Sequence, residues 1–523
     1  MTLVSFITLC VSLTAALCLG AVNFMHYFQL NSYKFAEHKE WLLRNVGRLC
    51  LLAILAAAVG LCALVGGATG LFIAAALTAL YALAAKPKSA KSSKKPIVFT
   101  TRVKRMLATE AVLAVGFFAA LSLLMPTCLA PIWAGVVLLF LPYLNLAANI
   151  INAPIEKAIC NYYINDAKKM LAAHKSLKVV GVTGSYGKTG TKYALTALLS
   201  EKYDVLMTPA SYNTPMGVVK TIRSSLRATN EIFVCEMGAK YVGDIDELCQ
   251  IVDPDLGIIT SVGEQHLLTF GGLDNIVKTK FEIADYLKNK NCPTIVGYDN
   301  ENIKKELCRR GADEFVRCGS DENADFRVSD VSADERGTSF TLTLASGESV
   351  RLTVALLGAH NVSNIACAAA AAYKLGMSLD EIRLAAKKIR SAPHRLEMSR
   401  RGRDILIDDA YNANPAGTRA ALDALSLFEG CKIIITPGMV ELGGESEDFN
   451  YRLGKDAARI CDYILLVGER QTRPIAKGAA DAGFSADRLG VFERVEDAIN
   501  YAFSITAEGR RIVLLENDLP DNY

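Results

Sequence analysis

A glycine-rich turn between an apolar run and a helix-like stretch constrains the fold of this chain more than any other feature. Residues 179–182 are apolar, the turn Thr-Gly-Ser-Tyr-Gly-Lys-Thr occupies 183–189, and residues 193–199 have a helical pattern. Glycines let backbone N–H groups turn around phosphate oxygens, the lysine reaches terminal phosphates, and the last threonine can hold Mg²⁺. Strand, loop and helix in this order predict a phosphate-binding α/β domain. A chance Lys-Thr pair after a glycine turn is the alternative.

The first 150 residues are dominated by apolar segments. We expect about five membrane spans there: Leu3–Phe24, Leu49–Val65, Leu71–Ala85, Leu107–Leu124 and Leu129–Ile150. A span needs about 20 apolar residues, so the second and third are short and are expected to pair as a hairpin through the glycines at 66–70. A buried soluble helical core is the alternative, but apolar runs this dense are rare in soluble domains.

Basic residues in the loops predict the orientation of these spans. They lie between the first and second segments and between the third and fourth: Lys34, Lys39, Arg44, Arg48, Lys86, Lys88, Lys91, Lys94, Lys95, Arg102, Lys104 and Arg105. The positive-inside rule places both loops in the cytoplasm. We therefore expect a multi-pass protein of the cell membrane, in contact with membrane lipid, whose residues after 150 are cytoplasmic. Pro154 is expected to end the last span, and 154–176 to form an amphipathic connector.

The remaining chain alternates strand-like and helical stretches, which is the pattern of a mostly parallel α/β sheet. The expected strands of a central domain, 177–390, are 179–182, 232–236, 256–260 and 294–297, and segments 326–328, 339–345 and 349–355 alternate with period two as an antiparallel insertion. A second, Rossmann-like domain is expected over 391–523, with strands at 405–407, 433–435, 463–467, 489–492 and 511–515. The expected membrane region is 1–153.

Charge and cysteine content exclude some classes of protein. The chain of 523 residues has a formal net charge of +3, so we expect no nucleic-acid partner. Its 14 cysteines are scattered, without a Cys-x-x-Cys pair, which argues against a zinc ribbon or a disulfide framework and fits a reducing compartment.

Several chemistry-bearing residues follow the expected strands or open helices. Glu236 ends one strand, His266 follows the next, and Lys280 lies in a Lys-Thr-Lys-Phe-Glu segment that opens a helix. Further along are Gly-Ala-His-Asn-Val-Ser-Asn at 358–364, His-Arg-Leu-Glu at 394–397 and Asp-Asp-Ala-Tyr-Asn-Ala-Asn-Pro at 408–415. Each alone is a weak signal, since a lone histidine is more often structural and a lone lysine a surface charge.

In this order, the motifs resemble the Mur ligase family, and the resemblance covers about residues 177–503. The Asp-Asp-x-Tyr-Asn-Ala-Asn-Pro run and Gly-Met-Val-Glu-Leu-Gly at 438–443 are most similar to the MurF type, which adds D-alanyl-D-alanine to a UDP-N-acetylmuramoyl tripeptide. The resemblance implies an ATP-dependent peptide ligase of peptidoglycan precursor synthesis, with a cell-wall precursor and an amino acid or dipeptide as substrates. Protein partners are not implied.

The resemblance also implies residue roles. The implied ATP-binding residues are Gly184, Ser185, Tyr186, Gly187, Lys188, Thr189, Asn361, Asn364, Arg395 and Asp409. The implied metal ligands, for Mg²⁺, are Thr189, Glu236, His266 and Lys280, of which Lys280 is expected to be carbamylated. The implied catalytic residues are Lys188, His266, Lys280 and Arg395. The implied substrate contacts are Asn213, Tyr411 and Asn414.

Two departures from the family pattern leave the substrates open. The apolar region stands where the family has its UDP-sugar domain, so a lipid-linked precursor is an alternative acyl substrate. The family's Lys-Gly-Ser after the last strand is absent from the final stretch, 515–523, which leaves the amine donor open. A non-catalytic membrane scaffold and an ATP-driven transporter are the rival functions. Five spans are few for a pore, and polar residues within them are sparse.

Overall fold

The computed structural model describes residues 2–31, 33–86, 96–124, 126, 129–264, 267–311, 314–411, 414–440 and 445–517. The chain divides into two compact units, Met1–Tyr162 and Tyr163–Leu519.

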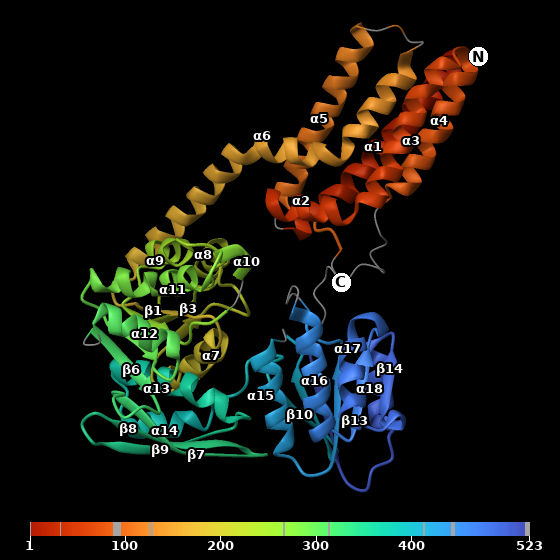
Figure 1. Ribbon diagram of the computed structural model, residues 1–523. Helices are drawn as coiled ribbons and strands as arrows, with labels where there is room; N and C mark the ends of the chain where they lie inside the picture. Colours follow the sequence, from red (N-terminus) through yellow and green to blue (C-terminus); the bar gives the residue numbers. More distant parts are fainter. Residues whose placement is uncertain are drawn as a thin grey trace. The chain divides into compact units, whose positions relative to one another are not determined.

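The first unit is helical (Figure 1). Its helices are α1 (Thr2–Leu30), α2 (Phe35–Arg44), α3 (Val46–Leu61), the 3₁₀ turn η1 (Cys62–Leu64), α4 (Gly67–Ala84), α5 (Thr101–Leu124) and α6 (Ala130–Ala173). By length and composition, four helices among the described residues can cross a membrane: α1, α3 with η1, α4 and α6. The fifth expected span, Leu107–Leu124, lies in α5, which is not one of the four.

The expected break at Pro154 is wrong, because α6 continues through it to Ala173. A proline inside a helix removes one backbone donor and does not remove the hydrogen bonds of the turns on either side. The end of α6 carries part of the expected amphipathic connector, where Ala167 is buried in a core of the second unit.

The central part of the second unit is a nine-stranded sheet with the order β2-β3-β1-β4-β5-β6-β7-β8-β9. Its strands are β1 (Lys178–Thr183), β2 (Val205–Met207), β3 (Ile232–Glu236), β4 (Leu256–Ile259), β5 (Thr294–Gly297), β6 (Phe315–Gly319), β7 (Phe326–Asp334), β8 (Gly337–Leu344) and β9 (Ser349–Val354). The strands up to β7 pair in parallel, and β7, β8 and β9 pair antiparallel. The expected antiparallel segments therefore extend the same sheet.

Helices cover both faces of this sheet. One core contains side chains of α7 (Lys188–Leu199), α13 (Val362–Lys374) and α14 (Leu379–Ala386). The other contains side chains of α8 (Pro215–Ser225), α9 (Asp244–Val252), α11 (Leu273–Lys288) and α12 (Glu301–Arg310). The short helix α10 (Leu267–Phe270) precedes α11. Because β1, β3 and β4 are parallel neighbours, their carboxyl ends bring the glycine turn, Glu236 and the 260–264 segment to one edge.

The last part of the unit is a second sheet with the order β10-β11-β15-β12-β13-β14. The strands are β10 (Glu397–Arg401), β11 (Asp404–Asp409), β12 (Cys431–Thr436), β13 (Tyr463–Val467), β14 (Leu489–Phe492) and β15 (Arg511–Glu516), with helices α15 (Pro415–Ser426), α16 (Ser446–Ile460), α17 (Glu469–Asp481) and α18 (Val495–Ser504). The five expected strands are present, and all pair in parallel. The additional strand β10 pairs antiparallel with β11.

Candidate active site

The glycine turn joins β1 to α7 in a geometry that only glycine permits. Gly184 has φ +148° and Gly187 has φ +83°, both in the region that favours glycine. A Cβ at Gly184 would lie 2.1 Å from Thr260 Oγ1, and one at Gly187 would lie 2.2 Å from Asn364 Oδ1. The turn is therefore a tight cradle at a helix N-terminus, as phosphate binding requires.

Ser185 and Tyr186 fasten this turn to the segment after β4. The Ser185 N–H donates to Ser261 O (2.7 Å), and the Tyr186 N–H donates to Ser261 Oγ (3.0 Å). Their side-chain hydroxyls donate to Gly263 O and Glu264 O, each at 3.0 Å. Both residues were predicted to bind ATP, and the structure shows that their polar groups hold the turn in place.

Lys188, the first residue of α7, folds back over the turn. Its Nζ donates to Gly184 O (2.7 Å) and Ser185 O (2.9 Å). Burial lowers the pKa of Lys188 to about 8, the charge of Glu236 opposes this shift, and Arg395 adds to it. The ammonium group is thus already at the turn, close to both an anionic and a cationic side chain.

Glu236, at the end of β3, is the centre of the polar cluster. Its Oε2 accepts from Thr189 Oγ1 (3.1 Å) and its Oε1 accepts from Asn213 Nδ2 (3.1 Å). Lys192 Nζ lies 3.0 Å from Oε2, with both side chains almost completely buried. Carboxylate and hydroxyl oxygens are the ligands that Mg²⁺ prefers, so Glu236 and Thr189 fit a magnesium site.

Lys192 is a residue that the sequence analysis missed. It also donates from Nζ to Ala210 O (2.6 Å), and so connects α7 to the segment that carries Asn213. Its position four residues after Lys188 places both lysines on the same side of α7. In the sequence, this spacing from Lys188 is the one sign that Lys192 belongs to the site. It is a weak sign, because surface lysines often follow one another at the same spacing in a helix.

Lys280 is buried on α11 with 3 % of its surface exposed. Burial and then the like charge of Lys188 lower the pKa of Lys280 to about 7, and Asp244 and Glu282 oppose the shift. An amine with this pKa is substantially uncharged at neutral pH, which is the form that adds CO₂. His266, which is implied to be a metal ligand together with Lys280, lies outside the described residues.

The two asparagines implied to bind ATP differ in their contacts. Asn364, on α13, lies against Gly187 of the phosphate turn. Asn361 donates from Nδ2 to Leu357 O (3.0 Å).

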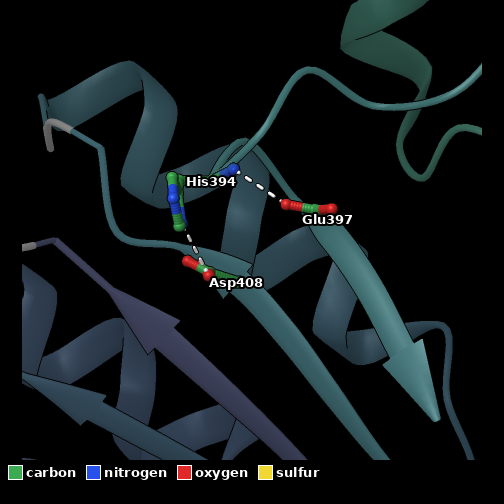
Figure 2. A group of neighbouring side chains, drawn as sticks. All are labelled: His394, Glu397 and Asp408. Carbon is green, nitrogen blue, oxygen red and sulfur yellow. Dashed lines mark hydrogen bonds and ion pairs between the residues drawn. The ribbon is translucent and has the colours of Figure 1, made fainter.

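Arg395 lies in a tight turn before β10 that is held by its neighbours. His394 and Leu396 have φ +57° and +48°. The backbone N–H of His394 donates to Glu397 Oε2 (3.1 Å). The ring nitrogen Nδ1 of His394 donates to Asp408 Oδ2 (2.8 Å), and Figure 2 shows both contacts. The Leu396 N–H donates to Asp409 Oδ1 (3.1 Å). Arg395 is thereby presented from a fixed backbone.

The predicted substrate residues of the last domain have different partners. The guanidinium of Arg395 lies 4.5 Å from the centre of the Tyr411 ring, and the Tyr411 hydroxyl contacts Ser211 Oγ. Asn414 caps α15, because its Oδ1 accepts from the N–H of Gly417 (3.0 Å).

Two family matches cover most of the second unit. Residues 182–372 match the Mur ligase middle domain, and residues 394–516 match the Mur ligase glutamate ligase domain. The UDP-N-acetylmuramoyl-tripeptide–D-alanyl-D-alanine ligase of Escherichia coli (strain K12) is 31 % identical over 346 residues, which are 65 % of this chain and 75 % of the relative. The chain belongs to the Mur ligase family. The Bacillus subtilis (strain 168) ligase of the same name is 32 % identical over 340 residues, 64 % of this chain and 72 % of the relative.

Solved structures agree with this assignment. A crystal structure of MurF from Acinetobacter baumannii superposes with a TM-score of 0.63 and 27 % identity, covering 69 % of this Mur ligase and 78 % of the other chain. MurF ligase from Thermotoga maritima, solved in complex with ADP, superposes with a TM-score of 0.58 and 26 % identity, covering 68 % and 80 %. This Mur ligase is accordingly an ATP-dependent, MurF-like ligase with the middle and C-terminal domains of its family.

Proposed function

We propose that this Mur ligase forms the amide bond between a muramoyl-tripeptide carboxyl group and D-alanyl-D-alanine. The relatives that support this carry that activity in their names. The observation that carries it is the convergence of Lys188, Thr189, Asn213 and Glu236 at the carboxyl ends of β1 and β3.

The reaction has two steps. The substrate carboxylate attacks the γ-phosphorus of ATP, which breaks the bond to the β-phosphate oxygen and gives an acyl phosphate and ADP. The amine then attacks the acyl carbon, inorganic phosphate leaves, and the amine releases a proton. The first step brings two anions together, so positive charge is required around them.

Several residues of this chain could supply that positive charge or position the substrates. Lys188 lies at the turn that would hold the phosphates, and Arg395 is close enough to affect the pKa of Lys188. Thr189 and Glu236, with His266 and a carbamate on Lys280, would hold Mg²⁺, which supplies further positive charge to the phosphates when bound. Asn213, which donates to Glu236, would orient the acyl substrate beside that carboxylate.

The four apolar helices support a second proposal about location. We propose that the Met1–Tyr162 unit crosses the cell membrane, with the domains at 177–390 and 391–523 in the cytoplasm. ATP is available there, and the basic loops favour the same orientation. A lipid-linked muramoyl-tripeptide at the cytoplasmic leaflet is then the second candidate for the acyl substrate.

The test is phosphate release by the detergent-solubilised full chain with Mg-ATP and D-alanyl-D-alanine. UDP-muramoyl-tripeptide and its lipid-linked counterpart are compared as acyl substrates, with Lys188→Ala as the inactive control. Turnover with the UDP form supports the MurF activity, and turnover with only the lipid-linked form assigns substrate recognition to the helical unit. Release that does not depend on either acyl substrate, or that persists in Lys188→Ala, would contradict the proposal.

A further inference from the structure

Two acidic residues lie side by side at the carboxyl ends of two neighbouring strands in the second sheet. Asp409 ends β11 and Glu516 ends β15, and the two are direct partners in the parallel register. Only 1 % of the surface of Glu516 is exposed. Adjacent carboxylates in such a position are unusual, because each ion opposes the other and the buried Glu516 cannot be solvated.

The hydrogen bonds of the pair leave one atom unaccounted for. Thr418 Oγ1, from α15, donates to Glu516 Oε1 (2.7 Å), and the Leu396 N–H donates to Asp409 Oδ1 (3.1 Å). Glu516 Oε2 is buried and has no donor among the described residues. Because Asp409 and Glu516 are register partners on adjacent parallel strands, their side chains project from the same face of the sheet and lie next to each other. Contact between two carboxylates becomes a hydrogen bond only if one of them carries a proton.

We propose that Glu516 is uncharged in the folded protein and donates a hydrogen bond through Oε2 to Asp409. This arrangement satisfies the unpartnered oxygen and leaves the pair with a single negative charge, on Asp409. Glu516 is then a positioning residue. It holds the carboxylate of Asp409, one of the residues implied to bind ATP, and the inference rests on the proposed function for this last step.

The surrounding charges favour this placement of the proton. Burial raises the pKa of Glu516 well above its usual range, and the charge of Asp409 raises it further. Burial also raises the pKa of Asp409, but the Leu396 N–H and Arg395 oppose that shift, while Asp408 adds to it. Arg395 stabilises a negative charge on Asp409, and no cation among the described residues does the same for Glu516, so the charge is more stable on Asp409.

Infrared spectroscopy of the full-length protein in detergent at neutral pH tests the protonation directly. A buried, protonated carboxylic acid has a carbonyl band separate from those of carboxylates and amides. We expect the wild-type spectrum to lose one such band in Glu516→Gln and to keep it in Glu429→Gln, an exposed glutamate of the same domain. Identical acid bands in wild type and Glu516→Gln would overturn the proposal.

Nucleotide binding tests the positioning role without any acyl or amine substrate. The glutamine amide can donate to Asp409 and accept from Thr418, so Glu516→Gln should bind a fluorescent ATP analogue with about wild-type affinity. Glu516→Ala removes the donor, and we expect affinity to fall about tenfold, the loss expected for one buried hydrogen bond. Equal weakening in both variants would overturn the positioning role. Because neither assay requires turnover, failure here is distinct from failure of the proposed ligase activity.

Discussion

At the scale of single residues, the centre of the candidate site is Glu236, whose two oxygens have three protein donors. Lys192 is the buried cation among them, and it also fixes the backbone at Ala210. Ala210 has φ +43°, a conformation that is unfavourable for alanine and needs support from its surroundings. The ion pair therefore holds together the helix, the strand end and the segment that carries Asn213.

Lys192→Met should destabilise the protein and reduce activity, because it leaves Glu236 as a buried anion without its cation. The free energy of unfolding should fall by about 3 kcal/mol or more, and kcat/KM for the acyl substrate should also fall, as measured by denaturant unfolding and phosphate release. Lys202→Met removes a solvent-exposed pair with Glu381 and should change the stability much less. Equal losses in the two variants would show that the buried pair has no special role.

Lys280→Ala should abolish turnover and leave the fold intact, because the carbamate proposed at this position would be lost. Phosphate release and circular dichroism measure the two effects. Lys278, on the same helix but exposed, provides the matched control, and Lys278→Ala should keep wild-type activity. Full activity in Lys280→Ala would exclude the carbamate.

The pKa of Lys280 gives this site a dependence on pH and CO₂. With a pKa of about 7, the amine is uncharged above that pH and protonated below it, and only the uncharged form adds CO₂. Activity in CO₂-free buffer should therefore be low, and bicarbonate should restore it at pH 8 much more than at pH 6. A bicarbonate effect that is the same at both pH values, or absent, would contradict carbamylation.

Individual roles were the hardest feature to predict from the sequence. The motif order predicted the family, and Thr189, Asn213 and Glu236 do lie together. Lys192 and Glu516 could not be found in this way, because a lysine in a helix and a glutamate after a strand are common on surfaces. Their significance depends on burial and on partners from distant segments, such as Ala210 and Asp409.

At the scale of elements, the connection from β1 to α7 shows how a backbone conformation determines a site. Gly187 is the N-cap of α7 in a left-handed conformation, with Asn364 directly against its α-carbon. Alternation of apolar and helical stretches predicted the sheets well because strand and helix periods differ. It did not predict that β7–β9 continue the first sheet, because the spacing of apolar residues along a strand does not show which other strand it pairs with.

Gly187→Ala should impair ATP binding strongly, because the new methyl group would meet Asn364 and the φ angle would be strained. We expect a loss of about 5- to 150-fold in affinity for a fluorescent ATP analogue, from about 1–3 kcal/mol of strain. Gly190, three residues later in the helix, has open space around its α-carbon. Gly190→Ala should bind normally and be stabilised by about 0.5–1 kcal/mol. Normal ATP binding by Gly187→Ala would contradict the role assigned to the turn.

Considered as a whole, the chain joins a ligase to an apolar helical unit. The hydropathy pattern predicted five spans, and four described helices are long and apolar enough. Pro154 was misjudged because a proline is tolerated inside a helix when the flanking turns keep their hydrogen bonds.

Cysteine labelling tests the proposed orientation. Cys308 is exposed on α12 of the ligase part. In intact cells, a membrane-impermeant maleimide should leave Cys308 unlabelled, and permeabilisation should expose it, with Cys308→Ser identifying the label. The protein should also remain in the membrane pellet after alkaline washing. Labelling of Cys308 in intact cells would reverse the topology, and release by alkali would exclude spanning helices.

The contact between Gly187 and Asn364 has a consequence for the kinetics of nucleotide capture. The phosphate turn and the first turn of α13 touch each other directly, and Lys188 already lies across the turn. The turn therefore loses little conformational entropy when a nucleotide binds. The nucleotide does not have to wait for a rare, open conformation of the turn. Association should therefore be a single bimolecular phase whose rate rises linearly with ATP concentration, and any slow isomerisation would belong to a later stage of the reaction.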